Sequence, residues 1–493
     1  ITACGSTVQG TGTGALGAPA AVTGGDGLGA PAAAAPGEVL APGEVPVAGD
    51  AAAAPATGGT TGTGTAGSSG GGTATTGGAA APGSAPVAGA PAGATKTGPV
   101  KVGFVNTKVG NAESLGVNAG QTYSTDQVFR ALVKAMNAKG GVAGRRIEPV
   151  TADTDTASSD WNRDFQAACE KLTRDDKVAV VVGYSFAFYT SFESCLAKAG
   201  VPHLNGAYTV GDEQTLRDFP TLFATNALTA DRRYRLQIEG AVRDGFVTKS
   251  SKIGLLLDAC PEQTRAVKRT VDPLIKKLGL TEAARATFSC PAGAGDAGAL
   301  ASQVQAAVLR FRERGVDRVF IEGVPMVVFS QSAESQGYRP GYFVTSTTGG
   351  AALEPNVPRA QLANVRGYGW MPQVDVNANN QPPKTASQQR CLALLKSQGV
   401  VPSQYNDFHS AYTTCDGLFL YEAALRRTGG DDRAASVAAA IQALGSTHAG
   451  VGVHETRTSF ASGRREAPAV YRAWSYVGDC SCFRFRSAAQ PIP

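Results

Sequence analysis

The stretch NAKGGVAGR, residues 137–145, decides the fold class through the elements that surround it. Ahead of it, the apolar run at residues 100–105 predicts a buried strand. The segment from Ser124 onward carries apolar side chains at spacings of three and four, which predicts an amphipathic helix. Two glycines end that helix, because glycine accepts the left-handed geometry of a helix C-terminus. A second strand is predicted at residues 147–150, and a strand, a helix and a strand in this order predict a parallel α/β unit.

The same alternation continues along the chain. The unbroken apolar run VAVVV at residues 178–182 is typical of a strand in a sheet that is covered on both faces. A second series begins at residues 253–257, so we expect an α/β fold with two doubly wound units and a break near residues 222–226. The further predicted strands are residues 201–204, 284–289, 316–321 and 342–346, and the further predicted helices are residues 159–173, 185–199, 261–278, 298–314 and 327–336.

Composition separates the start of the chain from the rest. Of 493 residues, 17% are charged and 7% aromatic, with 61 glycines and 27 prolines, and residues 1–98 contain no Phe, Tyr, Trp, His or Arg. Such a segment has too little apolar surface to offset its ordering entropy, so we expect a disordered Ala/Gly/Pro/Thr tether. The net charge of +5 comes without any Lys/Arg-rich run, which argues against nucleic acid as a partner.

The first four residues, Ile1-Thr2-Ala3-Cys4, resemble the bacterial lipobox, whose cysteine carries lipid after signal cleavage. Acyl chains on Cys4 would anchor the protein to the extracellular face of the cytoplasmic membrane. The alternatives are an ordinary cysteine in a disordered leader and, for the tether, a glycosylated Thr/Ser stalk around residues 60–76.

The stretch at residues 137–145 also resembles the N-x-x-G-G-(I/V)-x-G-(R/K) signature of type I periplasmic binding proteins, closest to the branched-chain amino-acid receptor group. Residues 181–183, before a serine-bearing turn, and residues 420–429, a late helix, are similar to that group as well. The resemblance implies two Rossmann-like lobes joined by a three-strand hinge. By position, lobe 1 would be residues 99–223 plus 368–465, and lobe 2 residues 224–367 plus 466–493.

The resemblance further implies an extracytoplasmic solute-binding lipoprotein, not an enzyme, that delivers an amino acid, an amide or a related solute to an ABC importer. The solute would bind between the lobes, at the carboxyl ends of the strands, with Ser185 and neighbouring backbone amides on its carboxylate. The group's acidic ammonium ligand would fall near residues 345–347, where no residue is acidic, so Glu322 or Asp258 would have to take that role. The candidate ligand-binding residues are Asn106, Tyr184, Ser185, Phe186, Ala207, Tyr208, Thr209 and Glu322.

Cysteine usage indicates an oxidising compartment. If Cys4 carries lipid, the remaining eight of nine cysteines can pair as disulfides. Zinc is not expected because the four histidines are scattered along the chain, and we expect no other metal or cofactor. The topology suggests the pairs Cys169–Cys195, Cys260–Cys290 and Cys391–Cys415. Cys480 and Cys482 are then left over, and Cys480–Cys482 would close a tight, small ring.

Two other functions remain open at this point. The run GYSFA, residues 183–187, follows a buried strand and opens a predicted helix, as the nucleophile elbow of an α/β serine hydrolase does. Ser185 would be the nucleophile, with His409, His448 or His454 as base. Two successive α/β halves argue against a hydrolase, whose sheet is continuous. The second alternative is a sensory receptor that binds the solute without transport.

Overall fold

The computed structural model describes residues 98–108, 121–183, 189–454, 458–460 and 463–493, all within one compact unit, Pro86–Pro493. The predicted tether lies outside these residues except for Gly98, and so does Cys4. Within the described ranges, no helix has both the length and the apolar character that crossing a membrane requires.

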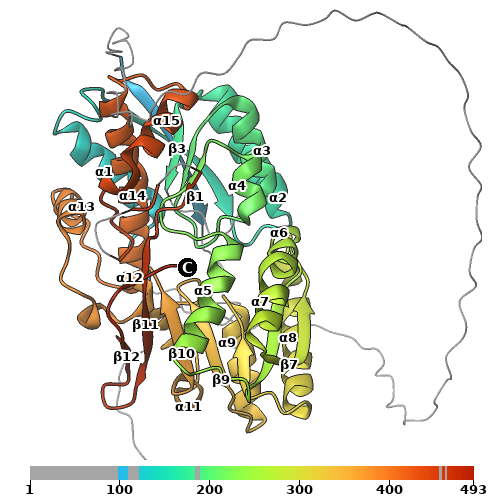
Figure 1. The fold of residues 1–493 in the computed structure, drawn as a ribbon. Coiled ribbons are helices and arrows are strands. Elements are labelled where there is room, and N and C mark those ends of the chain that lie inside the picture. Colours follow the sequence, from blue (N-terminus) through green and yellow to red (C-terminus); the bar gives the residue numbers. More distant parts are fainter. Residues whose placement is uncertain (1–97, 109–120, 184–188, 455–457, 461–462) are drawn as a thin grey trace, which may run out of the picture. The chain divides into compact units, whose positions relative to one another are not determined.

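The first sheet is entirely parallel, with the strand order β2-β1-β3-β4-β5. Its register places Val102 of β1 between Pro149 of β2 and Val180 of β3. Figure 1 shows this sheet and its helices in the upper half of the view. The strands are β1 (Val100–Lys108), β2 (Ile147–Asp155), β3 (Val180–Gly183), β4 (His203–Asn205) and β5 (Leu222–Ala224).

Helices cover both faces of the first sheet, and together they form the first lobe. On one face, Phe104 stacks on Phe129 of α1 with ring centroids 4.7 Å apart, in a core that α13, α14 and α15 share. On the other face, Val105 and Val181 pack against α2 and α3. The helices are α1 (Thr125–Asn137), α2 (Trp161–Glu170) with the π-helical turn η2 (Lys171–Asp175), α3 (Thr190–Ala199), α4 (Glu213–Asp218), α13 (Ala386–Lys396), α14 (Tyr405–Arg427) and α15 (Ala434–Leu444).

Residues 137–145 form the turn from α1 into β2. The Asn137 side chain donates to the carbonyl oxygen of Ile147 and accepts its N–H, both at 2.8 Å, which fixes the start of β2. Gly141 has a φ of +72°, and a Cβ there would lie 2.0 Å from the carbonyl oxygen of Arg145. Only glycine fits this position.

The second sheet has the strand order β12-β11-β10-β9-β8-β6-β7. The strands β7, β6, β8, β9 and β10 are parallel to one another. Strand β11 pairs antiparallel with β10 on one side and with β12 on the other. The short strand β13 pairs with β11. The strands are β6 (Lys252–Asp258), β7 (Thr281–Phe288), β8 (Arg318–Phe320), β9 (Gly341–Thr345), β10 (Val365–Gly369), β11 (Val470–Val477), β12 (Cys482–Phe485) and β13 (Gln490–Pro491).

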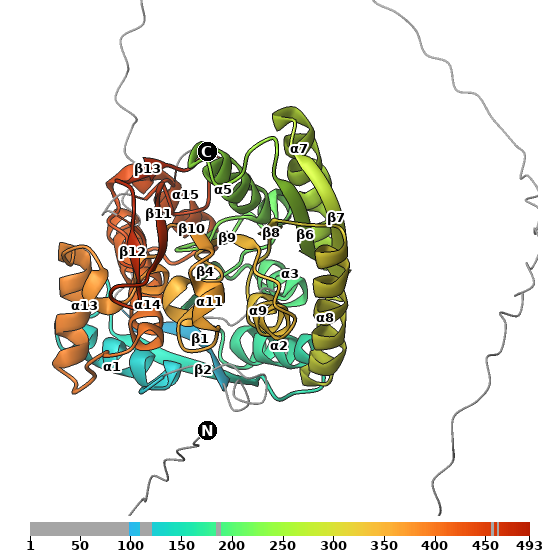
Figure 2. The same cartoon turned by 90° about the horizontal axis from the view of Figure 1, so that it is seen from below.

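The second sheet is covered on both faces too, and with its helices it forms the second lobe. Figure 2 shows α5 and α7 on one side of the sheet and α8, α9 and α11 on the other. The α/β fold with two lobes is therefore confirmed. The helices are α5 (Ala230–Arg243), α6 (Pro261–Ala266), the π-helical turn η3 (Val267–Val271), α7 (Asp272–Leu278), α8 (Ala297–Glu313), α9 (Pro325–Ser335), α10 (Gly350–Leu353) and α11 (Arg359–Leu362). The short helix α12 (Pro372–Asp375) follows β10.

The helix predicted at residues 261–278 is three consecutive pieces, α6, η3 and α7. Pro273 lies at the start of α7. Its nitrogen carries no hydrogen for the carbonyl four residues earlier, and a wider π-helical turn before it accommodates that lost bond.

Three segments carry the chain between the lobes, and they are hydrogen-bonded to one another. The Trp370 indole N–H, after β10, donates to the carbonyl oxygen of Asn226, after β5, at 2.7 Å. The carbonyl oxygen of Trp370 accepts the N–H of His454 on the third segment at 3.0 Å. Ala224 also forms a parallel bridge with Glu466.

Four disulfides lie within the folded unit. They join α2 to α3, the N-cap of α6 to the segment after β7, α13 to α14, and the turn after β11 to the first residue of β12. The pairs are Cys169–Cys195, Cys260–Cys290, Cys391–Cys415 and Cys480–Cys482.

Candidate functional site

A cavity of about 860 Å³ lies where strands of both sheets end. Its first-lobe wall includes Thr209, which follows β4. Its second-lobe wall includes Asp258 at the end of β6, Glu322 after β8 and Thr347 after β9. The carboxyl ends of parallel strands are where α/β proteins bind ligands, because loop amides and helix N-termini gather there. We call this cavity the interlobe cleft.

On the first-lobe wall, the turn after β4 presents an aromatic surface. The side-chain oxygen of buried Asn205 accepts the N–H of Ala207 at 2.6 Å and fixes the turn. The next residue, Tyr208, stacks on His409 of α14, with ring centroids 4.2 Å apart and an angle of 22° between the planes. Burial lowers the pKa of His409 to about 3, so its ring is neutral at ordinary pH. The pair forms a flat, uncharged platform.

On the second-lobe wall, a buried ion pair joins α5 to the end of β8. Arg233 Nε lies 2.5 Å from Glu322 Oε2, and the Arg233 side chain is only 3% exposed. The hydroxyl of Thr345 donates to Glu322 at 2.6 Å, while Gln263 accepts from Arg233 Nη2 at 3.0 Å. Burial raises the pKa of Glu322, although the Arg233 guanidinium opposes that effect. The wall is therefore internally neutralised at this point.

Asp258, like Glu262 and Asp218, is an acidic residue of the cleft lining that the Arg233–Glu322 pair does not include. Its Oδ1 accepts the N–H of Cys260 at 2.6 Å, and within the described ranges the residue has no ion-pair partner. Burial raises the pKa of Asp258 to about 6, and the nearby Glu262 carboxylate raises it as well. A donor group on a bound solute would stabilise the Asp258 carboxylate.

The structure brings three of the predicted residues together at the cleft: Tyr208, Thr209 and Glu322. Ala207 is fully buried behind them, with its N–H on Asn205. Asn106 donates to Asp153 and accepts from the Thr125 hydroxyl, both at 2.8 Å, and does not border the cleft among the described residues. Tyr184, Ser185 and Phe186 lie outside the described residues.

Sequence reasoning missed other cleft residues. Arg233 and Gln263 lie on helices near their first turns, and no local pattern distinguishes them from solvated helix residues. The sequence suggests His409 only as a base for a hydrolase, although this residue follows the polar start of a long apolar helix. Trp161 and Tyr405 also border the cleft. An aromatic ring at the start of a helix is the sequence feature that could have identified these two residues as cleft residues.

One group in the described part places three metal-ligand atoms within 4.8 Å of one another: Asp258, Cys260 and Cys290. The two cysteines are joined in a disulfide, so neither offers the thiolate that metal binding requires. The group therefore does not fit a metal ion.

A model of the family described as "Periplasmic binding protein" matches residues 99–469. The chain belongs to this family. The binding protein thus carries the type I two-lobe architecture. No match was found among curated protein sequences.

Solved structures share the fold of this binding protein. A branched-chain amino acid ABC transporter protein from Thermus thermophilus, solved with bound valine, is 15% identical with a TM-score of 0.60, over 80% of this chain and 97% of that chain. An R. palustris ABC transporter solute-binding protein in complex with 4-hydroxybenzoate is 15% identical with a TM-score of 0.58, over 80% and 98%. A leucine-binding protein from Thermotoga maritima is 14% identical with a TM-score of 0.56, over 80% and 99%.

Proposed function

We propose that this binding protein captures a small carboxylate-bearing solute outside the cytoplasm and delivers it unaltered to an ABC importer. The observation that carries the proposal is the cleft of about 860 Å³ at the carboxyl ends of both sheets, with chemically different walls on the two lobes. Related structures bear the names of ABC transporter proteins and hold valine or 4-hydroxybenzoate.

Valine and 4-hydroxybenzoate share a carboxylate and a second polar group, an ammonium or a hydroxyl. Ser185 and the turn at Tyr208 and Thr209 take the carboxylate in our proposal, with Tyr184 and Phe186 beside them. The platform of Tyr208 and His409 packs against the body of the solute, since aromatic rings favour offset stacking. Asp258 accepts the hydrogen of the ammonium or hydroxyl group.

Glu322 has a different part in this proposal from the one that the family resemblance implied. Its carboxylate is engaged by Arg233 and by the Thr345 hydroxyl, so it holds the second-lobe wall in place instead of receiving an ammonium group. Asp258 carries that part because it forms no salt bridge among the described residues, although the nearby Arg233 guanidinium lowers its pKa.

We also propose how the protein is anchored and how its lobes move. Cys4 carries lipid and residues 1–98 form the tether, so the folded unit works outside the cytoplasmic membrane. The lobes comprise residues 99–223 plus 368–465 and residues 224–367 plus 466–493. They close about the three hydrogen-bonded crossing segments, and the permease recognises the closed state.

The experiment is a thermal-shift comparison of each acid with its uncharged partner: 4-hydroxybenzoate against methyl 4-hydroxybenzoate, and L-valine against L-valinamide. We expect an acid to raise the melting temperature and its partner to leave it unchanged, because a ligand that binds only the folded state stabilises it. Failure of every acid would contradict the proposal. Hydrolysis of the ester, lost in Ser185→Ala, would establish the hydrolase instead.

A further inference from the structure

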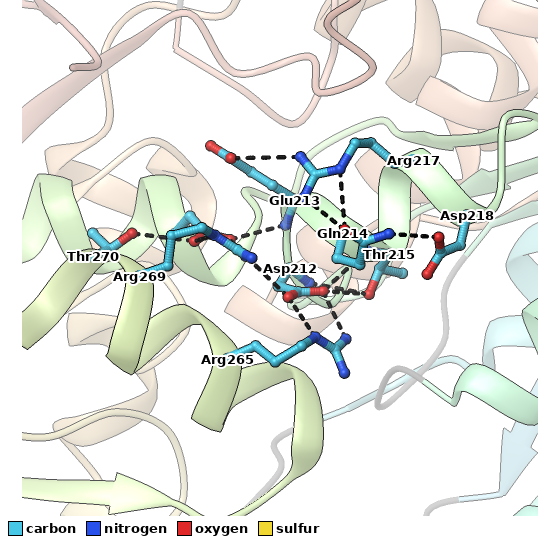
Figure 3. Close-up of polar contacts among 10 residues, drawn as sticks. Asp212, Glu213, Gln214, Thr215, Arg217, Asp218, Arg265, Arg269 and Thr270 are labelled. Carbon is cyan, nitrogen blue, oxygen red and sulfur yellow. Dashed lines mark hydrogen bonds and ion pairs between the residues drawn. The ribbon is translucent and has the colours of Figure 1, made fainter.

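An ion network joins the two lobes beside the cleft (Figure 3). Asp212, which is fully buried, accepts from Arg265 Nε at 2.9 Å and from Arg269 Nη2 at 3.0 Å. Arg269 also donates to Asp231, through Nε at 2.7 Å. The two buried carboxylates therefore share the Arg269 guanidinium, and Asp212 binds the Arg265 guanidinium as well.

The network crosses from one lobe to the other. Asp212 is the N-cap of α4, where its side chain accepts from the Thr215 N–H, and α4 packs with β5 of the first lobe. Arg265 and Arg269 lie on α6 and η3 of the second lobe, and Asp231 lies in the first turn of α5. Separation of α4 from α6 would therefore break both contacts of Asp212 with arginine.

The contacts of Asp212 with Arg265 and Arg269 stabilise its buried negative charge. Burial by itself would raise the pKa of Asp212, but hydrogen bonds from Arg265, Thr215 and Arg269 outweigh it and hold the pKa below its usual range. A buried carboxylate without a cationic partner is strongly disfavoured. The exposed Arg217 on the same helix offers a contrast, since it pairs with Glu213 at 3.9 Å and its side chain is 55% exposed.

The segment that carries the two arginines also forms part of the cleft wall. Gln263 of α6 borders the cleft and accepts from Arg233 Nη2 at 3.0 Å and from the Tyr234 hydroxyl at 2.7 Å. Arg265, two residues further on, borders the cleft as well. The short helix α6 therefore carries both a member of the interlobe network, Arg265, and a residue of the cleft wall, Gln263.

We propose that Asp212 is a positioning residue: through Arg265 and Arg269 it latches α6 to the first lobe and slows the opening of the cleft. This role rests on the solute-binding function proposed above. Opening requires the carboxylate to leave both guanidinium groups, so the latch prolongs the lifetime of the closed cleft and of a solute inside it.

The test measures the distance between the lobes in the full chain without solute. Nitroxide labels at Lys198→Cys on α3 and Lys277→Cys on α7, in a Cys4→Ser background, report it by double electron–electron resonance. We expect a narrow distribution for the parent chain, a broader and longer one for Asp212→Asn, and no change for Arg217→Gln. An unchanged distribution in Asp212→Asn overturns the latch.

Two additions keep the test decisive. If Asp212→Asn does not fold, Arg265→Gln and Arg269→Gln replace it, and unchanged distances in both overturn the latch. We also measure by stopped flow the rate at which 4-hydroxybenzoate leaves the cleft, or L-valine if only that acid binds. This rate should be at least tenfold higher in Asp212→Asn, or in the arginine variants that replace it, and unchanged in Arg217→Gln. If neither acid shifts the melting temperature of the parent chain, the proposed solute is wrong. The label-to-label distances still test the role of Asp212, because they are measured without solute.

Discussion

Tyr208 and His409 lie nearly parallel, with ring centroids 4.2 Å apart, although 201 positions separate them in the chain. Tyr208 belongs to the turn after β4, and His409 to the first part of α14. The packing of α14 against β3 and β4 brings the two rings together. The contact gives the cleft a neutral aromatic wall.

Removal of this wall should weaken the binding of an aromatic acid. We expect Tyr208→Ala to raise the Kd for 4-hydroxybenzoate about tenfold, since an aromatic pair contributes about 0.5–1.5 kcal/mol beyond the area it buries. Tyr208→Phe keeps the ring and should remain within about twofold. Isothermal titration calorimetry on both variants checks this, and equal affinities for the alanine and phenylalanine variants would contradict it.

The Arg233–Glu322 pair should be important for stability. Glu322→Gln leaves a buried guanidinium without its anion, and breaking one side of a buried pair costs about 3–5 kcal/mol. We therefore expect a marked loss of unfolding free energy in urea titrations. Arg339→Gln, which removes an exposed pair with Glu334, is the matched control and should change nothing measurable. Similar effects of the two substitutions would show that the buried pair has no special role.

The pH dependence of binding should report Asp258. Its pKa is about 6 because burial disfavours the charged form, so the carboxylate fraction rises between pH 5 and pH 7. The affinity for L-valine, whose ammonium stays charged in this range, should rise with pH over the same window and level off above it. In Asp258→Asn, which does not titrate, the affinity should be lower and flat. A pH profile that is the same in both proteins would rule out Asp258 as the acceptor.

The disulfides should differ in what they contribute. Cys391–Cys415 closes 24 residues between α13 and α14, whereas Cys480–Cys482 spans only 2. Loop-closure entropy grows with length, so Cys391→Ala/Cys415→Ala should lose about 3 kcal/mol of stability and Cys480→Ala/Cys482→Ala clearly less. Thermal melting, with non-reducing peptide mass spectrometry to verify the bonds, checks this order. The reverse order would contradict the entropic account.

Local signals in the sequence predicted much of the framework. The helix predicted from Ser124 onward forms, and a capping box of Ser124 and Gln127 fixes its start through bonds within one helical turn. The turn at residues 137–145 and the first four strands of the first sheet also follow from periodicity and glycine placement. The sequence did not predict the antiparallel strand β12, since its pairing with β11 depends on tertiary contacts.

The site was less accessible to sequence reasoning for the same reason. Tyr208 and Thr209 could be proposed because the end of a buried strand places the following turn at the edge of the sheet. The partnership of Arg233 with Glu322 could not, because it joins a helix to a strand end far along the chain, and a charged residue in a helix is ordinarily solvated. Asn106 was proposed for the same reason as Tyr208, its place toward the end of a buried strand. Its side-chain amide instead forms hydrogen bonds with Asp153 and Thr125.

The central claim is that the cleft binds a small carboxylate solute without changing it. The most direct measurement is a calorimetric titration of the full chain with 4-hydroxybenzoate and with L-valine, followed by mass spectrometry of the solute recovered from the complex. We expect saturable binding of at least one acid at one molecule per chain, with the solute recovered intact. Binding of neither acid, or recovery of a chemically altered solute, would contradict it.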